Sequence, residues 1–114
     1  MQVNVTAYNY DMYHPSITLI PLNKILLTTP IIQAVKSRGI KIPHDFKKQP
    51  HEIYTIPLTR MNSIIMAIQD DIVLDPIVVQ QYPNTSYYEI IDGRHRVAVS
   101  LLYRFPEIPA IIME

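Results

Sequence analysis

Hydrophobic residues in the first third of this chain change from a strand-like pattern to a helix-like one. The run 16–22 (SITLIPL) is apolar and β-branched, which favours a strand. Beyond it, apolar residues recur at helical spacing up to Gly39, with Thr29 as the predicted cap and Pro30 at the first helical position. The predicted buried face of this helix consists of Ile31, Ile32, Ala34 and Val35.

The middle of the chain combines a loop with a second strand and a second helix. Two prolines favour a surface loop over 40–52, and the run 52–58 (EIYTIPL) is typical of a strand. A helical pattern follows over 59–71, with Thr59 or Asn62 as its predicted cap. Its apolar residues lie three and four positions apart, as expected for one face of a helix: Met61, Ile64, Ile65 and Ile68.

The last third of the chain has the pattern of a hairpin followed by a helix and a strand. Residues 77–80 and 87–91 are the arms of the predicted hairpin, and Pro83-Asn84 lies in its turn. The run 107–113 (EIPAIIM) is the final predicted strand.

A predicted helix connects this hairpin to the final strand. It begins beyond Gly93, and Pro106 limits it at about Arg104. Its apolar stripe consists of Val97, Ala98, Leu101, Leu102 and Phe105. The complete order, β-α-loop-β-α-β-β-α-β, predicts a small single-domain α+β (mixed α/β) fold.

Length and composition restrict the domain organisation and the location. The 114 residues suffice for one small domain, which we expect over 16–114, after an N-terminal arm over 1–15 that contains Tyr8, Tyr10 and Tyr13. The chain has no apolar run of the ~20 residues that a membrane span needs. Its N-terminus lacks the features of a signal peptide. We therefore expect a cytoplasmic protein without a membrane partner.

Charge and residue types exclude several kinds of function. Ten basic and ten acidic side chains give a formal net charge of zero, whereas proteins that coat DNA are usually basic. The absence of cysteine excludes disulfides, thiolate nucleophiles and cysteine metal sites. Because glycine occurs only at Gly39 and Gly93, a Walker phosphate-binding loop is also excluded. Four potential metal ligands in the predicted loop lack a recognised spacing: His44, Asp45, His51 and Glu52.

The strongest chemical signal lies at the start of the last helix, in the sequence Asp92-Gly93-Arg94-His95-Arg96. Cationic side chains are disfavoured at a helix N-terminus, where the helix dipole is already positive. A bound phosphate would compensate them, because first-turn backbone N–H groups and the planar guanidinium both bind phosphate oxygens. We expect Asp92 to cap the helix and Gly93 to leave room for the ligand.

A structural explanation of the same residues stays open. The two arginines can pair with nearby carboxylates, each exposed pair contributing about 0–1 kcal/mol, and His95 can pack in the core. The carboxylates within reach are Asp92, Glu89 and Glu107. If Arg96 instead binds a ligand, neutralising it should abolish binding with little loss of stability.

The segment that begins at Asp75 resembles the core of the ParB/sulfiredoxin superfamily. The shared elements are a PIVV strand, a return strand that ends in IIDG, a helix that begins with His-Arg, and a final IPAII strand. Upstream, IYTIPLTRMNSIIMAI is similar to the strand and helix that open that core. The resemblance thus extends over 52–114 and implies a ParB/sulfiredoxin-like fold, whereas 16–51 are less clearly related.

The resemblance also implies a set of phosphate contacts and excludes some activities. The contacts would fall on Gly93, His95 and Arg96, with help from the backbone of Arg94. Sulfiredoxins have a catalytic cysteine where this chain has Arg94, so their chemistry is excluded. ParB partition proteins bind CTP and have a helix-turn-helix domain after this core. This sequence stops at Glu114, so we expect it not to be a complete partition protein.

Another branch of the superfamily consists of ATP- or ADP-dependent kinases of small molecules, and their Asp-Gly-x-His-Arg motif is closer to the one here. In such a kinase Asp92 would hold Mg²⁺ or accept a proton, unless it is only a cap, and His95 and Arg96 would neutralise the transferred phosphoryl group. Arg60 and Ser63 are further candidates for phosphate contacts. Four acidic residues remain equivalent candidates for a general base: Glu52, Asp70, Asp71 and Asp75.

We therefore predict a domain that binds a nucleotide, ATP, ADP or CTP, or another small phosphorylated ligand. Phosphoryl transfer or nucleotide hydrolysis is the reaction that the resemblance implies. Two alternatives stay open, a non-catalytic module associated with DNA or with another protein, and a metal-dependent nuclease. The neutral charge disfavours a DNA partner. The tyrosine-rich arm could pair with a second copy of the chain, which leaves a homodimer open.

Overall fold

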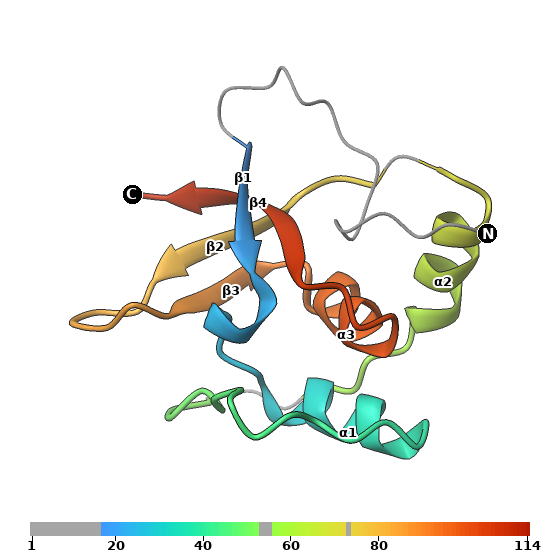
Figure 1. Cartoon of the computed structure of the whole chain (residues 1–114), viewed down its shortest axis with the longest axis horizontal. Coiled ribbons are helices and arrows are strands. Elements are labelled where there is room, and N and C mark those ends of the chain that lie inside the picture. The colour runs from blue at the N-terminus through green and yellow to red at the C-terminus, as the bar shows by residue number, and fades with distance from the viewer. Residues whose placement is uncertain (1–16, 53–55, 73) are drawn as a thin grey trace.

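The residues that the structure describes form three α-helices, one short 3-10 helix and a four-stranded sheet (Figure 1). The computed structural model describes residues 17–52, 56–72 and 74–114. The elements in chain order are β1 (Ile17–Pro21), η1 (Leu22–Lys24), α1 (Thr29–Ser37), α2 (Met61–Gln69), β2 (Ile77–Gln81), β3 (Tyr88–Asp92), α3 (Arg94–Leu102) and β4 (Glu107–Met113).

The four strands form a mixed sheet in the order β1-β4-β2-β3. β4 pairs with β1 in antiparallel and with β2 in parallel orientation, while β2 and β3 form the predicted hairpin. The hairpin turn includes Asn84, whose φ of 61° matches the tolerance of asparagine for the left-handed region. The sheet and the helices together confirm the predicted α+β fold class.

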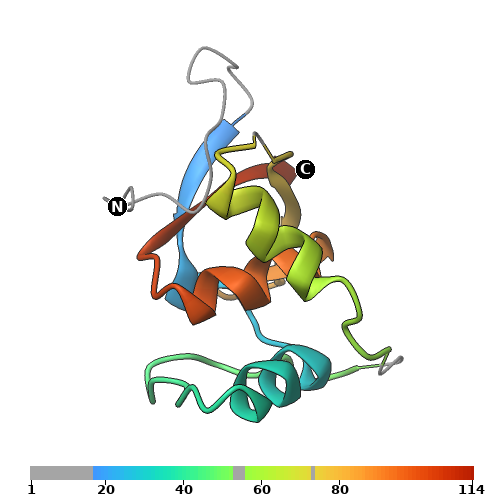
Figure 2. The same ribbon diagram turned by 90° about the vertical axis from the view of Figure 1, so that its right-hand side faces the viewer.

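The helix α3 lies between the other two helices and packs on the sheet (Figures 1 and 2). Its residues Val97, Ala98 and Val99 are fully buried against Ile77 of β2 and Ile108 of β4, which are also fully buried. Burying one Val or Ile side chain contributes about 1.5–3 kcal/mol, so this cluster holds the N-terminal end of α3 in place against the sheet.

The predicted strand over 52–58 is wrong for the residues that the structure describes. Residues 53–55 lie outside the described residues, and Glu52 and 56–58 have no regular secondary structure. Glu52 instead binds the start of α1, and Pro57 lacks the N–H group that a strand ladder requires. The predicted N-terminal arm, with Tyr8, Tyr10 and Tyr13, also lies outside the described residues.

Two predicted helix caps are also wrong. The residue Thr29 is the first residue of α1 and the cap position is Thr28, while the cap position of α2 is Arg60 instead of Thr59 or Asn62. Neither cap residue makes a side-chain capping hydrogen bond. The helices therefore begin where tertiary contacts place them, and the local capping pattern does not decide their first residue.

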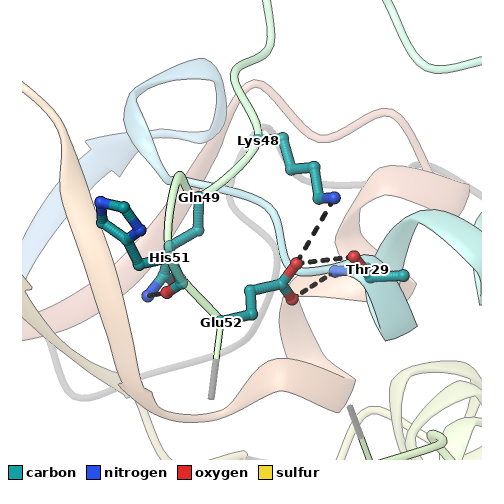
Figure 3. Close-up of polar contacts among 5 residues, drawn as sticks. All are labelled: Thr29, Lys48, Gln49, His51 and Glu52. Atoms are coloured by element: carbon teal, nitrogen blue, oxygen red, sulfur yellow. Dashed lines mark hydrogen bonds and ion pairs between the residues drawn. The ribbon is translucent and has the colours of Figure 1, made fainter. Parts of the chain in front are cut away.

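At the start of α1, a carboxylate from a distant loop takes over the role of a cap (Figure 3). The backbone N–H and the hydroxyl of Thr29 each donate to one carboxylate oxygen of Glu52, both at 2.6 Å. Lys48 Nζ lies 3.6 Å from the same carboxylate. Burial by itself would raise the pKa of Glu52, but the two hydrogen bonds from Thr29 and the charge of Lys48 hold it below its usual value.

We expect Glu52→Gln to lower the free energy of unfolding by about 1–2 kcal/mol, because an amide replaces a carboxylate that accepts two hydrogen bonds. The carboxylate stabilises the fold above its unfolded-state pKa, and this contribution is lost as the pH falls through the lower folded-state pKa. The variant should therefore lose less stability on acidification than the wild type. Urea unfolding at several pH values measures both effects. Asp70→Asn, at an exposed carboxylate just beyond the end of α2, is the control, and equal effects of the two substitutions would contradict the expectation.

None of the helices within the described residues has both the length and the hydrophobicity that crossing a bilayer requires.

Candidate functional site

The junction between β3 and α3 places the sequence Asp92-Gly93-Arg94-His95-Arg96 at a helix N-terminus, as predicted. The cap position is Gly93, with φ 109° and ψ 26°, and no side chain caps the helix. The predicted capping by Asp92 is therefore wrong. Its carboxylate instead pairs with Arg96, one helical turn later, at 3.1 Å. This ion pair is one of the alternatives that the sequence left open.

A side chain at position 93 has no room. A Cβ atom there would lie 2.5 Å from Cγ2 and 2.9 Å from Cβ of Ile77, a fully buried residue of β2. Gly93 thus lets the helix entrance approach β2 directly, in a backbone conformation that other residues rarely adopt.

Arg96 connects three segments around the helix entrance. Its Nη1 donates to the backbone carbonyls of Asp75 and of Pro76, the latter at 2.9 Å, and its Nη2 binds the Asp92 carboxylate. The side chain is only 14% exposed. These contacts give Arg96 a structural role, so we now expect its neutralisation to lower the stability of the fold. No local signal in the sequence could show it, because the two carbonyls lie about 20 residues earlier.

A pocket of about 470 Å³ opens at this helix entrance. It brings together every residue that the sequence predicted for phosphate contact, including the two from the start of α2. The lining residues are Arg60, Ser63, Ile64, Leu74, Asp75, Ile91, Asp92, Gly93, Arg94, His95 and Arg96.

Only one of the four acidic candidates for a general base lines this pocket. That residue is Asp75, in the segment before β2. Glu52 is bound to the start of α1, and Asp70 and Asp71 follow the end of α2 outside the pocket lining. The position relative to the pocket thus distinguishes the four acidic candidates, which the sequence left equivalent.

An apolar wall of the pocket was not predicted as part of the site. It consists of Ile64, Leu74 and Ile91. Ile91 is 48% exposed, although isoleucine is usually buried. The sequence contains one signal for this wall, namely an isoleucine directly before the charged motif that begins with Asp92-Gly93. Such a surface beside charged groups suits the organic part of a ligand.

The imidazole of His95 is harder to protonate than the sequence pattern, which suggested a cationic side chain, implied. Burial lowers its pKa, and the positive charges of Arg60, Arg94 and Arg96 lower it further. Its Nε2 atom is buried and has no hydrogen-bond partner among the described residues. Both effects favour the neutral form of the imidazole, and the permanent positive charge of the pocket comes from the arginines.

The four loop residues weighed as metal ligands do not assemble into a site. Asp45 accepts a hydrogen bond from Asn23, and Glu52 binds Thr29. Within 17–52, 56–72 and 74–114, no three His, Cys, Asp or Glu residues lie together in a geometry that could hold a metal ion.

The family model for the ParB N-terminal domain matches residues 32–114, from within α1 to the last residue of the sequence. The chain belongs to the ParB N-terminal domain family. The match confirms the superfamily that the sequence resemblance indicated, and it extends that relationship upstream of residue 52. No curated protein matches the chain.

Solved structures support the same fold for this ParB-family domain. One is a conserved hypothetical protein from Pyrococcus furiosus, with a TM-score of 0.52 and 17% identity, covering 87% of this chain and 32% of that one. Another is truncated ParB from Caulobacter crescentus complexed with CTP-gamma-S, with a TM-score of 0.52 and 19% identity, covering 86% and 44%.

A third structure is a mutant free serine kinase in complex with AMP, with a TM-score of 0.53 and 16% identity. It covers 94% of this chain and 34% of the kinase. This ParB-family domain therefore spans less than half of each of these three proteins.

Proposed function

We propose that this ParB-family domain binds a nucleotide or another phosphorylated ligand in the pocket at the N-terminus of α3. One observation carries the proposal. Arg60 from the start of α2 and Arg94 and Arg96 from α3 converge with His95 on a single pocket of about 470 Å³. Arg60 is far from the other three residues in the sequence, and packing of α2 on α3 brings it to them.

The balance of charge in the pocket favours an anion. Three arginines and two aspartates line it, and one of these aspartates, Asp92, is already paired with Arg96. Within the pocket lining, the carboxylate of Asp75 therefore remains to offset the charges of Arg60 and Arg94. Guanidinium groups bind phosphate oxygens through paired hydrogen bonds, and the first-turn N–H groups of α3 add the positive end of the helix dipole.

The related structures support a nucleotide as the phosphorylated ligand. Caulobacter ParB is complexed with CTP-gamma-S, and the free serine kinase is complexed with AMP. In this chain, the apolar wall of Ile64, Leu74 and Ile91 would contact the nucleoside while the arginines bind its phosphates. The candidates are ATP, ADP and CTP.

We further propose a reaction at this site, which goes beyond ligand binding. In phosphoryl transfer or nucleotide hydrolysis, Asp75 would accept the proton of the attacking hydroxyl. The arginines would neutralise charge on the phosphoryl group, and His95 would donate a hydrogen bond to it. The metal role predicted for Asp92 competes with its ion pair to Arg96. Mg²⁺ bound to a nucleotide takes most of its ligands from phosphate and water, so titrations with and without Mg²⁺ test this prediction directly.

We expect Arg60→Gln and Arg94→Gln each to weaken nucleotide binding by about 10–100-fold, the effect of losing one charge-assisted hydrogen bond. The melting temperature should change little, because Arg60 is exposed and the side chain of Arg94 makes a long hydrogen bond, 3.4 Å, to the Ile56 carbonyl. Calorimetric titration of ATP, ADP, AMP, CTP and GTP, with and without Mg²⁺, measures both binding and base preference.

Arg104→Gln is the matched control, since it removes the same charge just beyond the opposite end of α3. An equal loss of affinity in this variant, or no binding of any nucleotide by the wild type, would contradict the proposal. Adding duplex DNA to the titration at low salt tests the DNA-associated alternative. Incubating the same DNA with Mg²⁺ and examining it for cleavage tests the nuclease alternative.

A further inference from the structure

We infer that ligand binding in this pocket is coupled to proton uptake by His95, so that the domain holds its anionic ligand more tightly as the pH falls. The inference rests on the proposed function, because it concerns the same anion and the same pocket. It adds a regulatory property to that site, namely a dependence of affinity on pH that comes from the protein itself and not from the ligand.

The position of the imidazole is the first support. His95 lies in the first turn of α3, and its Nε2 atom is buried without a hydrogen-bond partner among the described residues. A buried polar atom without a partner is energetically unfavourable. His95 also lines the pocket of the proposed anion, so a ring nitrogen that turns toward the pocket would gain a phosphate oxygen as its hydrogen-bond partner.

The charged groups that face His95 are the second support. Arg94 and Arg96 approach it from α3, and Arg60 approaches it from the start of α2. The acidic groups of the pocket are Asp75, from the segment before β2, and Asp92, at the end of β3. Because Asp92 is paired with Arg96, positive charge dominates around the imidazole. Protonation of His95 is therefore opposed in the protein alone.

A bound phosphate reverses this situation. Its negative charges offset the three guanidinium groups, and its oxygens accept a hydrogen bond from the protonated ring. In the protein alone, the pKa of His95 is lowered, mainly by burial. In the complex, the bound phosphate should raise this pKa. Between these two values binding takes up one proton, and linkage then makes the affinity rise by up to about tenfold for each unit by which the pH falls.

The linkage has a matching effect on folding. Since the folded-state pKa of His95 is below its unfolded-state value, the unfolded chain binds the proton more readily. The stability of the protein alone should therefore decrease as the pH falls through the unfolded-state pKa. A bound anion should reduce this decrease.

Inorganic sulfate and ADP are suitable probes. Sulfate keeps its two charges over roughly pH 5 to 8, the range in which histidines titrate, so any pH dependence of its binding comes from the protein. NMR titration of the histidine ring protons over this range, without and with saturating ADP, measures the pKa of His95 directly. The spectrum of His95→Gln assigns its signal.

The pKa of His95 should rise when ADP binds, and the sulfate affinity should increase as the pH falls. His95→Gln should abolish this pH dependence, whereas His44→Gln, at an exposed histidine of the 40–52 loop, should leave it unchanged. Binding of ADP without a change in the pKa of His95 overturns the inference and leaves the proposed function intact. Absence of binding of both probes at every pH overturns the proposed function itself.

Discussion

Replacing Gly93 by alanine is expected to lower the free energy of unfolding by about 2–5 kcal/mol. Its φ of 109° lies in a region that costs an L-residue roughly 1–2 kcal/mol, and forcing extra atoms into a packed core adds about 1–3 kcal/mol. The new Cβ would meet the fully buried Ile77 at 2.5 Å. For a domain of this size the melting temperature should fall by at least about 10 °C, as differential scanning calorimetry can show.

Gly39→Ala is the matched control for this substitution. Gly39 also has a positive φ, 78°, but a Cβ atom there would have no other atom within 4 Å. The control therefore measures backbone strain alone, and the difference between the two variants measures the contact with Ile77. Combining Gly93→Ala with Ile77→Ala should cost less stability than the sum of the two single losses, because the second change removes the clashing Cγ2 atom. Equal losses for Gly93→Ala and Gly39→Ala would contradict the argument.

Arg96→Ala is expected to impair both folding and binding. The variant loses the hydrogen bonds to two backbone carbonyls and the ion pair with Asp92, which together contribute roughly 2–3 kcal/mol because the guanidinium is 14% exposed. The same substitution removes a phosphate ligand, so the nucleotide dissociation constant should increase by about 100-fold or more. Chemical unfolding and calorimetric titration measure the two effects.

Arg96→Lys distinguishes the two roles of this arginine. Lysine keeps the positive charge but cannot reach two carbonyls and a carboxylate with one planar group. We therefore expect Arg96→Lys to lose nearly as much stability as Arg96→Ala while retaining more of the affinity. A variant Arg96→Ala with the melting temperature and the affinity of the wild type would contradict both assignments.

The sequence predicted those elements of the fold whose pattern is local and strong. The apolar stripe of α3, the β2–β3 hairpin and the strand β4 follow from side-chain periodicity and turn residues within short windows. The strand expected over 52–58 had a suitable composition. Its described residues do not form a strand, because Glu52 binds Thr29 of another segment. The position of β4 between β1 and β2 depends on long-range pairing, which a local pattern does not contain.

The candidate site shows the same division. The motif 92–96 and its helix N-terminus could be predicted because they are continuous in sequence. Arg60 and Ser63 were predicted from the resemblance, and only the packing of α2 on α3 explains their presence in the pocket. The choice of Asp75 among four acidic residues required the tertiary structure. So did the lowered pKa of His95, which comes from burial and from arginines at the starts of two different helices.

The pairing of β1 with β4 has a consequence for how the chain acquires its structure. Ile17 lies opposite Ile111, and among the strands that the structure describes β1 pairs with β4 alone. During synthesis, β1 is made long before β4. The backbone N–H and C=O groups of β1 therefore emerge before the strand with which they pair. Contacts of this sequence separation slow folding, because a large loop must close before the pairing contributes any stability. The nascent chain therefore presents an unpaired strand until almost the entire domain has left the ribosome, and it is during this interval that the protein is most exposed to aggregation.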